Sequence, residues 1–315
     1  MKNNSLHLLL LCLSFVFSTT ILAQPLSSYD KKTIRSKEDS LQFFAKNLIT
    51  DSLTAGRMRY DSLFVKTLIR ALQTKNSFFY SFDSIQGVSK IYAPDSSFKI
   101  FTWYLQFDDY YGRQRGFIQL RTKDGSLKGF PLRDNSEFTE FPNSIVCRDT
   151  NWIGAVYYNI IKTQFQNKNY YTLFGNDYHS VRSSKKWIDV LTFDEKNRPV
   201  FGGPLFNFEE DSIIQETKHR FNIEYKKEAS AFVNFVPELN VILIDHLISE
   251  TGEPENTWTY IPDGDYEGFK WEKGKWVHIE KVFTDKLEDG KAPIDNPVFD
   301  AKNPTKKSKG IQQLR

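Results

Sequence analysis

Residues 98–107 read FKIFTWYLQF, and this stretch decides the fold class. Phe101, Trp103, Leu105 and Phe107 occupy every second position, so they share one face of an extended chain. Aromatic side chains favour strands and supply much of the contact area of a sheet interface. The whole sequence contains 27 Phe, 15 Tyr and 6 Trp. We therefore expect a protein that is mainly β, with an aromatic core.

The period of two extends from about Phe78 to Phe283. Asp124-Gly125 is a strong turn signal, and it links strands expected over 114–122 and 126–132. Further strands are expected over 157–165, 170–174, 187–193, 199–206, 221–225, 231–236, 241–248, 266–271 and 276–283. The pattern predicts a large antiparallel meander of about a dozen strands. A sandwich, a half-open barrel and an irregular propeller all fit it, whereas the uneven turn spacing disfavours a propeller of equal blades.

Before residue 77 the apolar period is 3.6 instead, which is typical of helices. Ser36-Lys37-Glu38-Asp39 matches a capping box. Apolar stripes follow at Leu41, Phe44, Ala45, Leu48 and Ile49, and again, after Gly56, at Phe64, Val65, Leu68, Ile69 and Leu72. Such stripes must be buried on a neighbouring layer. The sequence predicts an α+β arrangement in which a helical pair over 36–76 packs on a β domain over 77–283.

The two ends of the chain differ in composition from this central part. Residues 1–23 combine Lys2, an apolar run and Ala23, which is the pattern of a cleaved secretory signal peptide. We expect export to the periplasm or the cell exterior, and a mature chain without a transmembrane segment. Residues 24–35 are expected to be a disordered lead-in, and 284–315 a flexible polar tail.

Charge and cysteine content disfavour several classes of protein. Lys and Arg number 42 against 39 Asp and Glu, a net charge of +3, which gives no electrostatic basis for binding nucleic acid. Cys147 is the sole cysteine after the signal segment, so neither an intramolecular disulfide nor a Cys-based zinc site can form in the mature chain. The common local motifs of serine hydrolases, zincins, nucleotide-binding loops and thioredoxin-like proteins do not occur. No cofactor is expected.

Ionisable residues interrupt two strands that are apolar on both faces. Asp189 lies within 187–193, and Asp245 and His246 lie within 241–248. Strands of this kind are covered on both faces, and a buried carboxylate is costly unless it is paired. We therefore take Asp189, Asp245 and His246 as candidate catalytic residues.

Strand geometry limits how these residues can combine. Asp245 and His246 are neighbours that point to opposite faces, so they cannot form a dyad with each other. A dyad requires Asp189 with Asp245, or His246 with a second group such as His219 or His278. The alternative is structural, with each aspartate bonded to an Arg, a Tyr or a backbone group.

Two other groups are candidates for binding. A sugar-binding face would use exposed, coplanar aromatic rings, and the candidates are Trp258, Tyr260, Trp271 and Trp276. A metal site would use carboxylates spaced as in a calcium loop, and the candidates are Asp263, Asp265 and Glu267, although a full EF-hand pattern is missing. The segment 175–179, Gly-Asn-Asp-Tyr-His, is a further loop with potential ligands.

Several strings of the sequence are similar to those of one protein group. They are NSFFYSFD at 76–83, YAPDSSFKIFTW at 92–103, RQRG at 113–116, KWIDVL at 186–191 and PVFGGP at 199–204. On the basis of these strings, the chain from about residue 40 to 283 resembles uncharacterised exported proteins of Bacteroidota. The resemblance implies a bacterial envelope setting. It implies no activity, cofactor or site residue.

The function expected from the sequence is that of an exported cell-envelope protein, a non-catalytic binding or structural module. Its partner would be an envelope protein or a glycan. One alternative is a hydrolase-like enzyme with a carboxylate/His site. The other is a carrier that holds an apolar ligand between the sheet and the helices.

Overall fold

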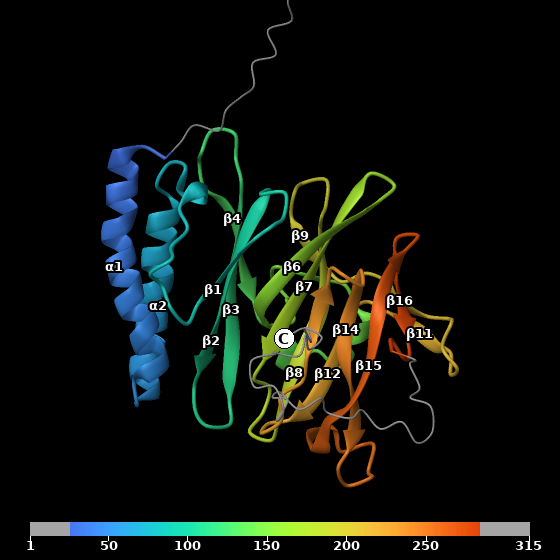
Figure 1. Cartoon of the computed structure of the whole chain (residues 1–315). Helices are drawn as coiled ribbons and strands as arrows, with labels where there is room; N and C mark the ends of the chain where they lie inside the picture. Colours follow the sequence, from blue (N-terminus) through green and yellow to red (C-terminus); the bar gives the residue numbers. More distant parts are fainter. Residues whose placement is uncertain (1–25, 284–315) are drawn as a thin grey trace, which may run out of the picture.

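The computed structural model describes residues 26–283 of the 315-residue chain (Figure 1). The expected signal peptide over 1–23 and polar tail over 284–315 lie outside the described residues. Within 26–283, neither helix is long and apolar enough to span a membrane.

Two helices precede the strands. α1 spans Ser28–Thr50 and α2 spans Thr54–Leu72. α1 begins earlier than predicted because Ser27, not Ser36, is its N-cap, and the Ser27 hydroxyl accepts a hydrogen bond from the Asp30 N–H at 3.0 Å. The prediction of a disordered lead-in is therefore wrong for residues 28–35.

The described strands form three open sheets, which confirms the prediction of a mainly antiparallel β fold with an N-terminal helical pair. The first sheet has the order β1 (Ser89–Tyr92), β2 (Phe98–Gln106), β3 (Gly112–Leu120) and β4 (Lys128–Arg133). The second has the order β5 (Cys147–Arg148), β9 (Pro199–Phe201), β8 (Ser183–Phe193), β7 (Lys168–Asp177) and β6 (Val156–Phe165), and β12 (Phe221–Lys226) also pairs with β8.

The third sheet has the order β11 (Gln215–Lys218), β10 (Phe206–Phe208), β16 (Lys275–Ile279), β15 (Tyr260–Glu272), β14 (Val241–Ser249) and β13 (Val233–Val236). β10 and β16 are parallel, and every other strand pair is antiparallel. Four 3₁₀ turns complete the described elements, namely η1 (Ser77–Phe79), η2 (Ser136–Phe138), η3 (Pro142–Ser144) and η4 (Thr257–Thr259).

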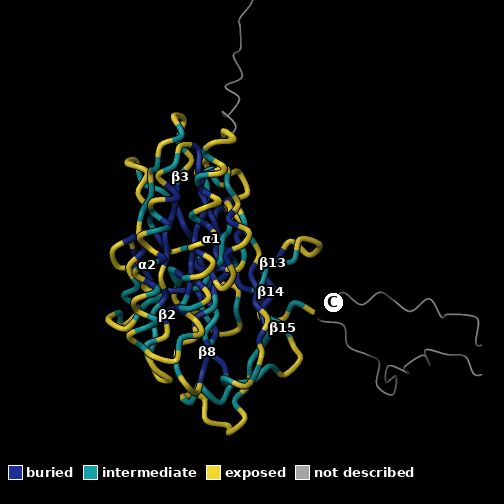
Figure 2. Tube along the Cα trace, turned by 90° about the vertical axis from the view of Figure 1, so that its left-hand side faces the viewer, coloured by how far each residue is buried: buried dark blue, intermediate teal, exposed yellow. Residues whose placement is uncertain are grey.

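These elements stack as four layers: helices, first sheet, second sheet and third sheet (Figure 1). Side chains alternate between the two faces of β2, and this accounts for the interface between the helices and the first sheet and for that between the first and second sheets. Phe101 and Trp103 face the helices, whereas Phe98 and Ile100 face the second sheet. β8 likewise directs Trp187 toward the first sheet and its neighbour Ile188 toward the third. The buried residues consequently run through the middle of the stack (Figure 2).

Candidate functional site

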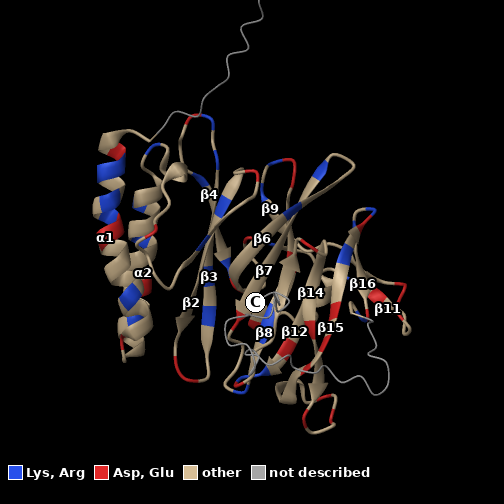
Figure 3. Cartoon of the chain, viewed as in Figure 1, with Lys and Arg blue, Asp and Glu red and all other residues tan. Residues whose placement is uncertain are grey.

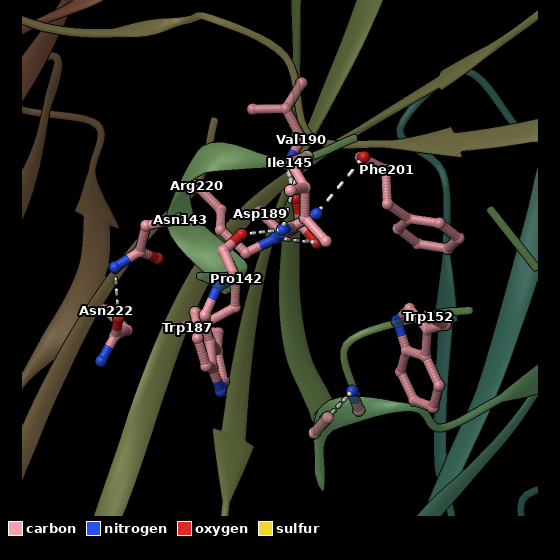
Figure 4. A network of polar contacts seen from close by, with 12 residues as sticks. Pro142, Asn143, Ile145, Trp152, Trp187, Asp189, Val190, Phe201, Arg220 and Asn222 are labelled. Carbon is pink, nitrogen blue, oxygen red and sulfur yellow. Dashed lines mark hydrogen bonds and ion pairs between the residues drawn. The ribbon is translucent and has the colours of Figure 1, made fainter. Parts of the chain in front are cut away.

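Asp189 is buried at the centre of a polar network in the second sheet (Figure 4). Its Oδ2 accepts a hydrogen bond from Arg220 Nε at 3.1 Å, and its Oδ1 accepts one from the Val190 N–H at 2.8 Å. Burial raises the pKa of Asp189, although the Arg220 guanidinium opposes this shift. The other N–H groups of Arg220 reach the backbone carbonyls of residues 142, 145 and 201. The pair therefore joins β8 to two neighbouring segments and is closed to substrates.

Asp245 and His246 have separate partners. Asp245 Oδ2 accepts a hydrogen bond from the Phe232 N–H at 2.6 Å, and His246 Nδ1 lies 2.8 Å from Asp263 Oδ2 at the surface. Among the described residues, no hydrogen bond or ion pair joins any two of Asp189, Asp245 and His246. The structure thus does not assemble the three into one catalytic site.

The four aromatic candidates do not form a flat surface. Trp276 is fully buried, and its Nε1 donates a hydrogen bond to Thr172 Oγ1 at 3.1 Å. Trp271 packs on Trp276 at an interplanar angle of 62°. The Arg182 guanidinium lies 4.4 Å from the ring centroid of Trp258, and the Tyr260 hydroxyl donates to a backbone carbonyl. The prediction that Trp276 belongs to an exposed binding face is wrong, because the period of two turns its ring into the core between the second and third sheets.

Each of the three candidate metal ligands interacts with a different side chain. Asp263 contacts His246, Asp265 pairs with Lys281 at 2.7 Å, and Glu267 Oε2 lies 3.3 Å from His278 Nε2. In the part of the chain that the structure describes, no cluster of three metal-ligating side chains occurs.

His278 connects β16 to the turn that follows β10. Its Nδ1 lies 2.9 Å from Asp211 Oδ2, and its side chain is only 6% exposed. Burial alone lowers the pKa of His278, but the carboxylates of Glu267 and Asp211 outweigh burial, and the net shift is upward. His278 therefore has carboxylate partners, not the His246 partner considered from the sequence.

We expect His278→Gln to lower the free energy of unfolding by about 1–2 kcal/mol near pH 6, and by less near pH 8. Because the pKa of His278 is raised on folding, its contribution is fully present below 6.5 and is lost as the pH rises through the folded-state pKa. Urea unfolding at both pH values measures this difference. Equal losses at the two pH values would contradict it.

A polar cleft lies where the first and second sheets meet, at the start of β3 and the end of β7. We call it the Asp177 cleft. It encloses about 410 Å³ and is lined by Tyr111, Gly112, Arg113, Gln114, Asp134, Ser136, Glu137, Thr139, Glu140, Pro142, Ile153, Asp177, His179, Lys185 and Trp187. The volume lies in the range of small-molecule sites. Because the two walls come from different sheets, the layered fold itself creates the cleft.

Asp177, the last residue of β7, is the most deeply placed acid of this cleft. Its Oδ1 accepts hydrogen bonds from Gln114 Nε2 at 2.6 Å and from the His179 N–H at 2.9 Å. Trp187 Nε1 lies 3.4 Å from the other carboxylate oxygen. Burial raises the pKa of Asp177, and the hydrogen bond and charge of His179 only partly offset this. The pKa shift marks Asp177 as a candidate functional group.

His179 and Lys185 stand beside Asp177 on the same wall. Burial and the charge of Lys185 lower the pKa of His179, so its imidazole favours the neutral form. Glu224 lies 3.6 Å from His179 Nε2 and 3.5 Å from Lys185 Nζ. Burial on its own raises the pKa of Glu224, but a hydrogen bond from Ser183 and the Lys185 charge make the net shift downward. Glu224 is thus an ionised support behind the wall.

The opposite wall comes from β3 and the segment after β4. Arg113 pairs with Glu137 at 2.9 Å, and the Tyr111 hydroxyl donates to the same carboxylate at 3.0 Å. Asp134 instead accepts the backbone N–H groups of Gln114 and Ser136, each at 3.0 Å. Asp134 therefore shapes this wall, whereas Arg113 and Glu137 offer charge to the cleft.

A second cavity, apolar in character, lies between α2 and the β3–β4 hairpin. It measures about 600 Å³, and its apolar walls include Val65, Ile69, Trp103, Phe117, Leu127 and Leu132. This is the position at which the sequence predicts a carrier site. The carrier function itself stays a prediction.

The sequence contained a partial signal for the Asp177 cleft. The segment 175–179, in which the sequence predicts a loop with potential ligands, supplies Asp177 and His179, although residues 175–177 form the end of strand β7. The sequence does not single out Gln114 and Arg113 on β3 or Glu137 in η2, because a lone polar residue has no local pattern that separates it from a solvated position. Comparison with protein families, curated proteins and solved structures found no match. The resemblance to exported Bacteroidota proteins stays a prediction.

Proposed function

We propose that this protein is an exported binding module that holds a small polar ligand in the Asp177 cleft. The observation that carries the proposal is the convergence of a buried carboxylate, an amide and an indole N–H from two different sheets. Binding sites combine a concave shape with a few convergent polar groups and titratable residues of shifted pKa. The Asp177 cleft has each of these properties.

The lining favours a polyhydroxylated ligand such as a saccharide. Hydroxyl groups both donate and accept hydrogen bonds, so they suit a wall that mixes carboxylates, an amide and a guanidinium. Tyr111 and Trp187 add aromatic surface to the same cleft. A free anion or cation fits less well, because Arg113 and Lys185 lie among Asp177 and Glu137. The sequence also predicts a glycan partner, although through different aromatic residues.

Asp177→Asn should weaken saccharide binding at least about tenfold, because it replaces a charge-assisted hydrogen bond with a neutral one. The measurement is a thermal-shift screen of neutral, amino and acidic saccharides, followed by calorimetry of those that stabilise the wild type. The matched control is Asp39→Asn, which makes the same change on the exposed face of α1. The proposal fails if no saccharide binds, or if the two variants bind equally well.

A second candidate function is acid–base catalysis in the same cleft. The observation that favours it is the pair of opposite shifts, upward for the pKa of Asp177 and downward for that of His179. Neighbouring titratable groups whose surroundings shift their pKa values in opposite directions are a feature of acid–base sites. Cleavage of a bound oligosaccharide by the wild type, lost in Asp177→Asn, would favour this function over binding alone.

A further inference from the structure

A second polar cleft lies at the opposite end of the same two sheets. It is formed where β3 ends and β4 begins, and where β7 begins, and it encloses about 610 Å³. We call it the basic cleft because its lining includes Arg121, Lys123, Lys128 and Lys168. No carboxylate belongs to that lining. Figure 3 shows Lys and Arg near the hairpin loops at this upper end of the two sheets.

The acidic residues of the surrounding turns are engaged elsewhere. Asp124 accepts hydrogen bonds from the N–H and hydroxyl of Ser126. Asp194 accepts backbone N–H groups of its own turn and pairs with Arg148 at 2.8 Å. These carboxylates fix the turns, and neither forms an ion pair with a cation of the cleft. Glu195, on the same turn as Asp194, is not part of the lining.

Asp95 is the acid most closely connected to the cleft. It bonds to two lining residues, Ser97 and Tyr171, at 2.6 and 2.7 Å. Its charge is offset by Lys162, whose Nζ lies 2.9 Å from Asp95 Oδ2. The hydrogen bonds from Ser97, Lys162 and Tyr171 outweigh burial and lower the pKa of Asp95 to about 2. Asp95 therefore orients the floor of the cleft without neutralising its rim.

The four cations of the cleft have no ion-pair partner among residues 26–283. Arg121 lies over the Phe79 ring at 5.2 Å, and Lys168 over the Tyr170 ring at 5.3 Å. Such contacts orient a cation but leave its N–H groups free to donate. Four cations along one lining, none of them paired with a carboxylate, give the cleft a positive potential that attracts an anion.

We infer that the basic cleft is a binding site for a phosphate or sulfate group carried by a polar molecule. The neutral lining supports a tetrahedral oxyanion, because the amides of Asn167 and Asn197 and the hydroxyl of Thr122 add donors around the cations. The inference is independent of the Asp177 cleft, since the two clefts share no lining residue.

The test is titration of inorganic phosphate and inorganic sulfate into the protein at constant ionic strength, followed by amide NMR shifts. The variant is Arg121→Gln/Lys128→Gln/Lys168→Gln. The matched control is Lys46→Gln/Lys66→Gln/Arg70→Gln, which removes the same charge from exposed positions of α1 and α2. We expect shifts around the basic cleft, and an affinity loss of at least about tenfold in the cleft variant only.

Two further binding measurements show whether the anionic group belongs to a lipid headgroup or to a soluble molecule. Phosphatidylglycerol vesicles, with phosphatidylcholine vesicles as the reference, report a lipid headgroup, whereas the inorganic ions report a soluble ester. Specific binding of either kind that is lost in the cleft variant supports the inference and assigns the source. The inference is overturned if neither probe binds, or if the cleft variant and the control bind equally well. Circular dichroism confirms that both triple variants remain folded.

Discussion

Arg220→Ala should lower the free energy of unfolding by about 3–5 kcal/mol, the largest loss that we expect from a single substitution in this protein. Both partners of the Arg220–Asp189 pair are almost fully buried, with side-chain exposures of 0% and 3%. Removing Arg220 leaves Asp189 without its counter-charge, and it also removes donors from backbone carbonyls of residues 142, 145 and 201. Urea unfolding monitored by tryptophan fluorescence measures the loss.

Comparing the stability of Arg220→Ala with that of two other variants distinguishes the effect of a buried, unpaired charge from the effect of removing any arginine. Arg198→Ala breaks a pair with Asp149 in which Arg198 is 46% exposed, so it should cost less than about 1 kcal/mol. The double variant Arg220→Met/Asp189→Leu should be more stable than Arg220→Ala, because no unpaired buried charge remains. A loss below about 1 kcal/mol in Arg220→Ala would show that the network does not depend on this pair.

The environment of Asp189 could be predicted from the sequence, but its partner could not. A carboxylate in a strand that is apolar on both faces must be buried, and the rule that buried charges are paired then follows. Arg220 lies 31 residues further along, just before β12, and no local pattern links the two positions. The pairing exists only because β12 adds to β8, with Phe221 opposite Ile188. Long-range strand pairing of this kind is set by the tertiary fold.

The same limit applies to the Asp177 cleft. The segment 175–179 is recognisable in the sequence because Asp177 and His179 stand two residues apart, although residues 175–177 end strand β7 and do not form a loop. Its partner Gln114 is 63 residues away and lies on the first sheet. The sequence predicts each strand through its own period, whereas the stacking order of the sheets decides which strand ends face each other. A site between two sheets is therefore harder to predict than the sheets themselves.

The start of α1 shows how a correct rule can select the wrong residue. Ser36 and Asp39 match a capping box, but Ser36 lies inside α1, eight residues after the helix begins at Ser28. Ser27 has the simpler signal of an Asp three residues later, and it is the cap that the structure contains. Inside a helix the backbone N–H groups already have intrahelical partners, so a capping motif there has no free donor to satisfy.

Substitution of Lys99 should cause the second large loss in the free energy of unfolding. Lys99 is the one cation of the stretch 98–107, and it lies on the helix-facing side of β2 with Phe101. Its side chain is almost fully buried, and Nζ donates hydrogen bonds to the carbonyls of Ser77, Phe78 and Tyr80 at 3.0–3.2 Å. Four aromatic rings also surround it, with centroids 5.0–5.6 Å from Nζ. Lys99→Met should therefore cost about 2–4 kcal/mol near pH 6, because three buried carbonyls lose their donor.

The cost of Lys99→Met should grow as the pH rises. Burial lowers the pKa of Lys99 from 10.5 to about 7, so between these values the unfolded chain holds a proton that the folded protein does not. The free energy of unfolding of the wild type then increases with pH over this window, and it levels off below about 7. Lys99→Met lacks this contribution, so its deficit should widen by about 2 kcal/mol from pH 7 to pH 9.

Other groups that titrate in this window contribute equally to the wild type and to Lys99→Met, so they cancel in the difference between the two. Urea unfolding at pH 6, 7, 8 and 9 gives that difference directly. A deficit that stays constant from pH 7 to pH 9 would mean that the carbonyls and rings around Nζ hold the pKa of Lys99 near its ordinary value despite burial. A widening deficit would mean that the protein folds around a lysine that loses its proton within the physiological range, because three carbonyls and four rings offset only part of the cost of removing an ammonium from water.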